Sequence, residues 1–151
     1  MLRYEVKILG ETMIKKINLR TAGLISVVIS LITIAIHTLV IFKVMPFTWI
    51  NGGRSETFEI AKQTSTISII ILIVGIFISF WACGIIHFKK FKKLLTAILW
   101  ISFAYACIGI ILQLIGTPFE RFFTSILCII NAIATFRLAI EKRNDYSIIS
   151  K

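Results

Sequence analysis

The sequence predicts an all-α fold, an integral membrane four-helix bundle with both termini in the cytoplasm. Of the 151 residues, 58% are hydrophobic and 16% are charged, and the mean hydropathy is +0.93, far from the average soluble domain. Four long runs carry almost no charge, and most basic residues flank these runs on one side. Together these observations favour a membrane protein over a soluble core, which would need a larger polar shell.

The four apolar runs are long enough to be tested as membrane spans. Residues 21–42 form a run of 22 without a charge, about 33 Å as a helix, which crosses a hydrocarbon core of roughly 30 Å. Residues 63–88 and 94–119 form runs of 26 without Asp, Glu, Lys or Arg. The run 122–136 has only 15 residues, so the fourth span must continue past Arg137, whose side chain is expected to extend to the lipid headgroups.

These runs define one membrane domain, residues 1–151, and the basic residues predict its orientation. The predicted parts are an N-terminal segment 1–20, spans at about 21–44, 64–88, 94–116 and 119–140, an outer loop 45–63 and a tail 141–151. Of the 17 basic residues, 13 lie in the N-terminal segment, between spans two and three, or after span four. The positive-inside rule places this side in the cytoplasm. The net charge of +10 therefore reflects topology and attraction to anionic lipid, and no nucleic-acid partner is expected.

The N-terminal segment does not resemble a cleavable signal, because the following apolar run is too long and lacks a small-residue cleavage site. It has apolar residues at helical spacing, which indicates an amphipathic helix at the membrane surface. They are Leu2, Val6, Leu9, Met13 and Ile17. A start of translation at Met13 is the alternative interpretation.

Each predicted span carries one stripe of small or polar residues at steps of three and four, which is typical of helix–helix contact in a bilayer. The stripes are Ser26, Ser30, Thr33 and His37; Gly75, Ser79 and Cys83; Ser102, Ala106, Gly109 and Gln113; and Thr124, Cys128, Asn131 and Thr135. They predict a closed bundle with a modestly polar interior. Packing alone accounts for most of this pattern.

The outer loop has the composition of an ordered turn. Pro46 ends the first helix, and the sequence Asn51-Gly52-Gly53 suits a turn that needs positive φ. Ser55 is expected to cap the second helix, with Glu56 in its first turn.

The candidate binding site joins this loop to the membrane. His37 lies about 10 Å below the outer end of span one, and Gln113 lies at similar depth in span three. With loop residues above them, they define a candidate ligand-binding pocket that faces outward. Its residues are His37, Trp49, Asn51, Arg54, Glu56 and Gln113. The Gly-Gly-Arg turn would offer backbone N–H groups and a guanidinium to an anion. The alternative is structural: a neutral His37 bonds Gln113 or a loop carbonyl and holds the loop over the bundle.

Catalytic, metal and cofactor sites are not expected. His37 and His87 lie at opposite ends of the predicted bundle, and the chain lacks metal-binding, phosphate-binding and nucleophile motifs. Glu56, Glu59 and Glu120 are expected on the outer surface, so no carboxylate for proton coupling is expected inside the membrane. The three cysteines fall within spans and form no C-x-x-C pair.

The loop also carries a resemblance. A histidine late in span one, followed by Pro46-x-x-Trp49-x-Asn51-Gly52-Gly53-Arg54 and then Glu59, is similar to a pattern in uncharacterised small four-span membrane proteins of bacteria. The resemblance implies a bacterial cell membrane and no particular chemistry.

The leading hypothesis is a non-enzymatic accessory, interaction or ligand-binding protein that contacts the lipid bilayer and either a membrane protein partner or further copies of itself. The alternative is an oligomeric transporter or channel component, supported by Asn131, Gln113 and His37. A third hypothesis is a membrane enzyme that uses His37 as a base or Cys107 and Cys128 as a redox pair.

Overall fold

The computed structural model describes residues 14–86 and 91–141 of the chain. The predicted amphipathic helix lies almost wholly outside the described residues, as do His87 and most of the C-terminal tail.

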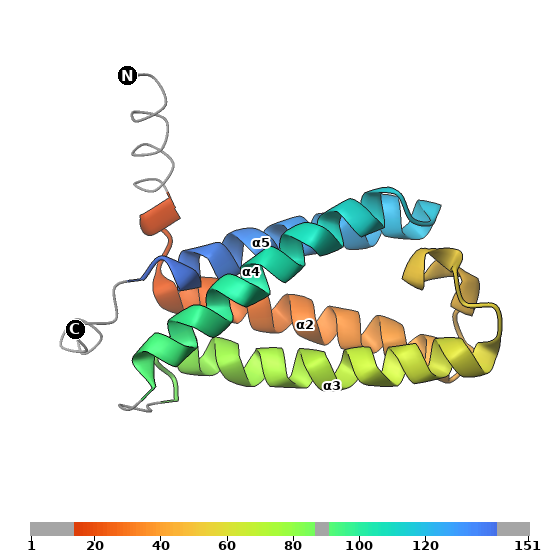
Figure 1. Ribbon diagram of the computed structural model, residues 1–151, viewed down its shortest axis with the longest axis horizontal. Helices are drawn as coiled ribbons and strands as arrows, with labels where there is room; N and C mark the ends of the chain where they lie inside the picture. Colours follow the sequence, from red (N-terminus) through yellow and green to blue (C-terminus); the bar gives the residue numbers. More distant parts are fainter. Residues whose placement is uncertain (1–13, 87–90, 142–151) are drawn as a thin grey trace, which may run out of the picture.

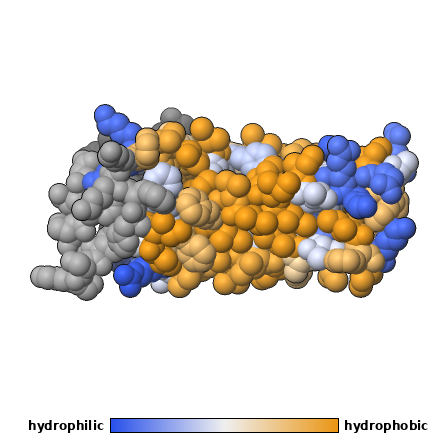
Figure 2. Space-filling view, turned by 90° about the horizontal axis from the view of Figure 1, so that it is seen from below, coloured by the Kyte–Doolittle hydropathy of each residue, from blue (hydrophilic) through white to orange (hydrophobic). Residues whose placement is uncertain are grey.

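The fold is an all-α bundle of four long apolar helices, which confirms the predicted fold class (Figure 1). The helices are α2 (Leu19–Ile41), α3 (Phe58–Ala82), α4 (Lys92–Leu114) and the continuous pair η3 (Glu120–Thr124) and α5 (Ser125–Ala139). Their lengths of 23, 25, 23 and 20 residues correspond to about 30–38 Å, so each is long and apolar enough to cross a membrane. Figure 2 shows a broad apolar band along the bundle, with hydrophilic residues toward both of its ends.

The bundle has two ends, a loop end and a terminal end. The loop end holds the connection between α2 and α3, residues 42–57, called the α2–α3 loop. The terminal end holds the start of α2 and the end of α5, which lie on the same side of the molecule (Figure 1).

Helix α2 is the central helix of the bundle. It packs against α3 on one side and α5 on the other, and α4 packs against α5. Helices α3 and α4 make no extensive contact with each other, so the bundle is not a closed ring. Both helices consequently expose most of their apolar side chains at the surface.

Small residues allow the closest helix contacts, as the stripes predict. A Cβ atom added at Gly23 of α2 would lie 2.5 Å from Cys83 Cβ at the end of α3. One added at Gly109 of α4 would lie 3.4 Å from Cys128 Sγ of α5. Gly75 differs, because an added Cβ there has no neighbour within 4 Å. The stripe on α3 therefore makes its contact at Ser79 and Cys83, which are both buried.

The cap of α3 is Thr57 instead of the predicted Ser55. Thr57 has extended backbone angles, and its hydroxyl accepts a hydrogen bond from Ile60 N at 3.4 Å. The acidic residue of the first turn is accordingly Glu59. The prediction was off by two residues because both positions carry a hydroxyl that is able to cap a helix.

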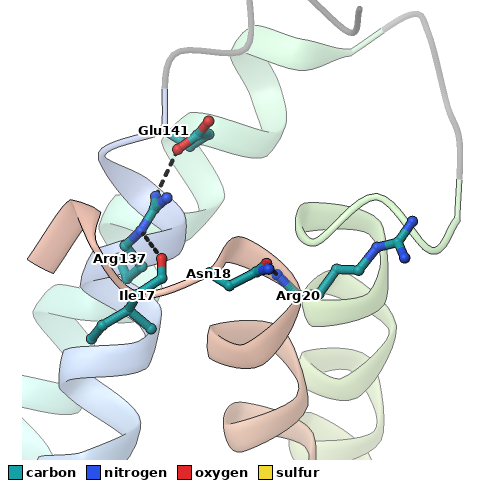
Figure 3. Close-up of polar contacts among 5 residues, drawn as sticks. All are labelled: Ile17, Asn18, Arg20, Arg137 and Glu141. Carbon is teal, nitrogen blue, oxygen red and sulfur yellow. Dashed lines mark hydrogen bonds and ion pairs between the residues drawn. The ribbon is translucent and has the colours of Figure 1, made fainter. Parts of the chain in front are cut away.

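Arg137 at the terminal end is buried, which corrects the expectation that it extends to the headgroups. The residue is 6% exposed. Its Nε donates to the carbonyl of Ile17 at 2.8 Å, and its guanidinium pairs with Glu141 at 2.6 Å (Figure 3). Two of its five N–H donors thus have fixed acceptors, and the bond to Ile17 fastens the segment before α2 to α5.

Candidate functional site

The α2–α3 loop folds back over the loop end of the bundle. Ile50 is its buried apolar residue, 4% exposed, and it packs with Ile36 and Val40 of α2. Phe119, just before η3, and Leu127 of α5 pack against the same cluster. Ile50 therefore fills the mouth of the bundle with an apolar side chain, which favours the folded loop over an extended one.

Three consecutive left-handed residues shape the tip of the loop. Asn51, Gly52 and Gly53 have φ angles of 58°, 69° and 66°. Glycine and asparagine tolerate this conformation best, so the sequence suits the turn. The turn also packs closely against Thr117, because a Cβ added at Gly53 would lie 3.3 Å from Thr117 Cγ2.

A buried carboxylate holds this turn to the start of the fourth helix. The backbone N–H of Gly52 lies 3.0 and 2.9 Å from the two carboxylate oxygens of Glu120. The N–H of Thr117 donates to Glu120 Oε2 at 2.9 Å. Glu120 is 7% exposed, so its charge is satisfied by backbone donors instead of water. The two segments that it joins are 68 positions apart in the chain.

Local sequence explains why Glu120 points inward. Thr117 and Glu120 form a capping box, with Pro118 at the first helical position. The Thr117 hydroxyl accepts from Glu120 N at 3.3 Å and donates to the carbonyl of Trp49 at 2.5 Å. Gly116 leaves the space that the carboxylate occupies, because a Cβ there would overlap Glu120 Oε2. The first turn that follows is a π-helix, Glu120–Thr124.

Glu120 is therefore a site residue that the sequence analysis missed, and its expected place on the surface was wrong. The signal was available: a Thr-x-x-Glu pattern directly after glycine indicates a capping box. A capping box turns the glutamate back toward the cap. Its second partner, Gly52, is not visible from that local pattern.

The six predicted site residues divide into an exposed group and a covered group. Arg54 and Glu56 are exposed, and Trp49 is 48% exposed with its ring 5.7 Å from that of Phe119. Below the loop, His37 Nδ1 lies 3.2 Å from Ser65 Oγ on α3.

The remaining two predicted residues have buried polar atoms. Asn51 Nδ2 and Gln113 Oε1 are inaccessible to solvent and have no hydrogen-bond partner in the part of the chain that the structure describes. His37 is bonded to Ser65, and no hydrogen bond joins it to Gln113 among residues 14–86 and 91–141.

The predicted anion site at the Gly-Gly-Arg turn has an occupant within the chain. The N–H of Gly52 faces the carboxylate of Glu120. The side chain of Arg54 lies along Gly52, where an added Cβ would be 3.1 Å from Arg54 Nε. Arg54 is exposed, so its guanidinium is the part of this turn that is accessible to solvent.

Polar residues of the bundle interior bond to one another. Ser26 Oγ on α2 donates to Asn131 Oδ1 on α5 at 2.8 Å, and Ser79 Oγ on α3 lies 3.2 Å from Ser26 Oγ. This contact joins three helices in the half of the bundle nearer the terminal end. Hydrogen bonds of this kind stabilise helix association by about 1 kcal/mol each.

No group of three His, Cys, Asp or Glu side chains able to hold a metal ion occurs within residues 14–86 and 91–141. The chain was also compared with protein-family models, curated proteins and solved structures. None of them matches.

Proposed function

We propose that the protein is a non-enzymatic interaction protein of the membrane, and that the α2–α3 loop is its recognition surface. The observation that carries this proposal is the attachment of the loop to Glu120. A buried carboxylate, a buried Ile50 and three left-handed residues hold one short loop in a single conformation. A loop fixed in this way loses little conformational entropy when a partner binds it.

The residue types on the fixed loop suit protein recognition. Trp49 and Arg54 are exposed, and tryptophan and arginine are the residues that most often dominate binding energy at interfaces. Glu56 adds an exposed charge beside them. We assign the three exposed residues to partner contact. His37, Asn51 and Gln113 have the supporting role, because they lie at or beneath the covered side of the loop.

The interior of the bundle supports this function over transport by a single subunit. Ile50 fills the mouth, and Ser26 and Asn131 bond to each other. A transport path through one subunit would need these groups to face water.

The distribution of basic residues orients the proposed surface. In the sequence, 13 of the 17 basic residues lie before the first span, between spans two and three, or after span four, so the positive-inside rule assigns these segments to the cytoplasm and the loop then faces outward. The loop pattern favours the cell membrane of a bacterium.

The test is extraction of the tagged protein from its own membranes with a mild detergent, followed by native mass spectrometry. A second polypeptide in fixed stoichiometry is expected with the wild type. It should be lost from Arg54→Ala and Trp49→Ala, and retained by Lys62→Ala, which removes an exposed cation from α3. A wild-type protein that is extracted alone, or a partner that stays with both loop variants, would overturn the proposal.

A further inference from the structure

The end of helix α2 has an unusual residue in its cap. Val44 N donates to Leu39 O at 2.9 Å and Lys43 N to Val40 O at 3.0 Å. This pair of bonds is a Schellman motif, which places Lys43 in the left-handed conformation with φ 59°. Glycine is the usual residue at this position, because other side chains are strained there.

Helix α3 provides the comparison within the same chain. It ends in the same pair of bonds, from Ile85 N to Phe80 O at 3.0 Å and from Gly84 N to Trp81 O at 3.2 Å. Here the left-handed residue is Gly84, with φ 78°. One helix therefore has the unstrained residue at its cap and the other has a lysine. Strained residues of this kind concentrate at functional sites, so the Lys43 side chain is a candidate for binding.

The side chain of Lys43 lies at the edge of a small hollow. Its ammonium is 4.4 Å from the centre of the Phe58 ring, which itself contacts Phe47 edge to face at 6.3 Å between centroids. The hollow has a volume of about 270 Å³, and its lining consists of Lys43, Met45, Pro46, Phe47 and Phe58. No carboxylate in the described part of the chain forms a salt bridge with Lys43.

Apolar side chains beside Lys43 place this hollow at the edge of the membrane. Phe42 and Val44 are 73% and 71% exposed, among the most exposed apolar residues of the chain. They lie within three residues of Ile41, the last residue of α2, where the apolar span ends. A cation between exposed apolar residues at this level matches a phospholipid, whose phosphate lies just above its acyl chains.

We propose that this hollow binds the headgroup of an anionic glycerophospholipid. The Lys43 ammonium contacts the phosphate, the apolar walls contact the glycerol and first methylene groups, and Phe42 and Val44 contact the acyl chains. This hollow lies in the same α2–α3 loop but is lined by none of the three residues assigned to partner contact, and the inference does not depend on the proposed function.

The experiment uses the full chain in nanodiscs that contain phosphatidylcholine and a photoactivatable phosphatidylglycerol with its reactive group near the glycerol. Adducts are mapped by peptide mass spectrometry. Adducts on residues 42–58 are expected, and adducts at the terminal end serve as the internal reference. In Lys43→Gly, adducts on 42–58 should fall roughly fivefold relative to the reference, the factor expected for one cation near an anionic surface.

Two features make the result decisive. Lys43→Gly relieves the left-handed strain, so the variant is expected to be at least as stable as the wild type. Lys62→Gln removes an exposed cation from the first turns of α3 and should leave the adducts unchanged. An unchanged ratio in Lys43→Gly, or an equal fall in Lys62→Gln, would overturn the site. Equal competition by soluble glycerol 3-phosphate would show a free-phosphate site and overturn the lipid assignment.

Discussion

Replacement of Glu120 by glutamine tests the attachment of the loop most directly. The side chains have nearly the same shape, but the amide is neutral and offers one acceptor oxygen where the carboxylate offers two. The N–H groups of Gly52 and Thr117 both depend on that carboxylate. Because a hydrogen bond to a charged group contributes about 1.5–3 kcal/mol, we expect Glu120→Gln to destabilise the closed loop by about 2 kcal/mol.

Hydrogen–deuterium exchange of the Gly52 amide measures this change. A loss of about 2 kcal/mol raises the open fraction of the loop roughly 30-fold, and the exchange rate should rise by the same factor. Amides in the middle of α3 should exchange as before, because the change is local. The matched control is Glu59→Gln, which neutralises an exposed glutamate in the first turn of α3. Unchanged exchange at Gly52 in Glu120→Gln, or an equal increase in Glu59→Gln, would refute the attachment.

Two further predictions concern packing and the terminal end. Gly23→Ala should lower the free energy of unfolding by about 1–3 kcal/mol, because its Cβ would lie 2.5 Å from Cys83 Cβ. Gly75→Ala should not lower it, since its Cβ has no neighbour within 4 Å. Steric trapping in bicelles compares the two variants, and equal losses would contradict the packing argument. Arg137→Gln should release the segment before α2 and speed tryptic cleavage after the exposed Lys16 severalfold. An unchanged cleavage rate would show that Arg137 does not hold this segment.

The fold class was predictable because a bilayer leaves few choices. A run of about 20 apolar residues must form a helix to satisfy its backbone groups, so length and composition are sufficient to predict four helices. The small-residue stripes also predicted close contact, as Gly109 and Cys128 demonstrate. They did not predict which helices are neighbours. The absence of extensive contact between α3 and α4 depends on how all four helices fit together.

The candidate site was predictable only in part, for a related reason. Local patterns indicated an ordered turn at Asn51-Gly52-Gly53, and three left-handed residues are present there. The prediction that Glu120 lies on the surface was wrong, because the burial of a carboxylate depends on hydrogen-bond donors supplied by distant segments. Arg137 was misplaced in the same way, since its acceptor is the backbone of Ile17.

The sequence by itself thus determined the spans, the turn at the loop tip and the capping box before α5, because each depends on residues within one or two turns of each other. The tertiary structure decided that Gly52 and Glu120 meet across 68 positions, and that Ile50 fills the bundle mouth. It also decided that the ammonium of Lys43 lies over the ring of Phe58. The physical reason is that a polar group inside the bundle is stable only beside a partner, and partners from separate helices meet only when the bundle is assembled.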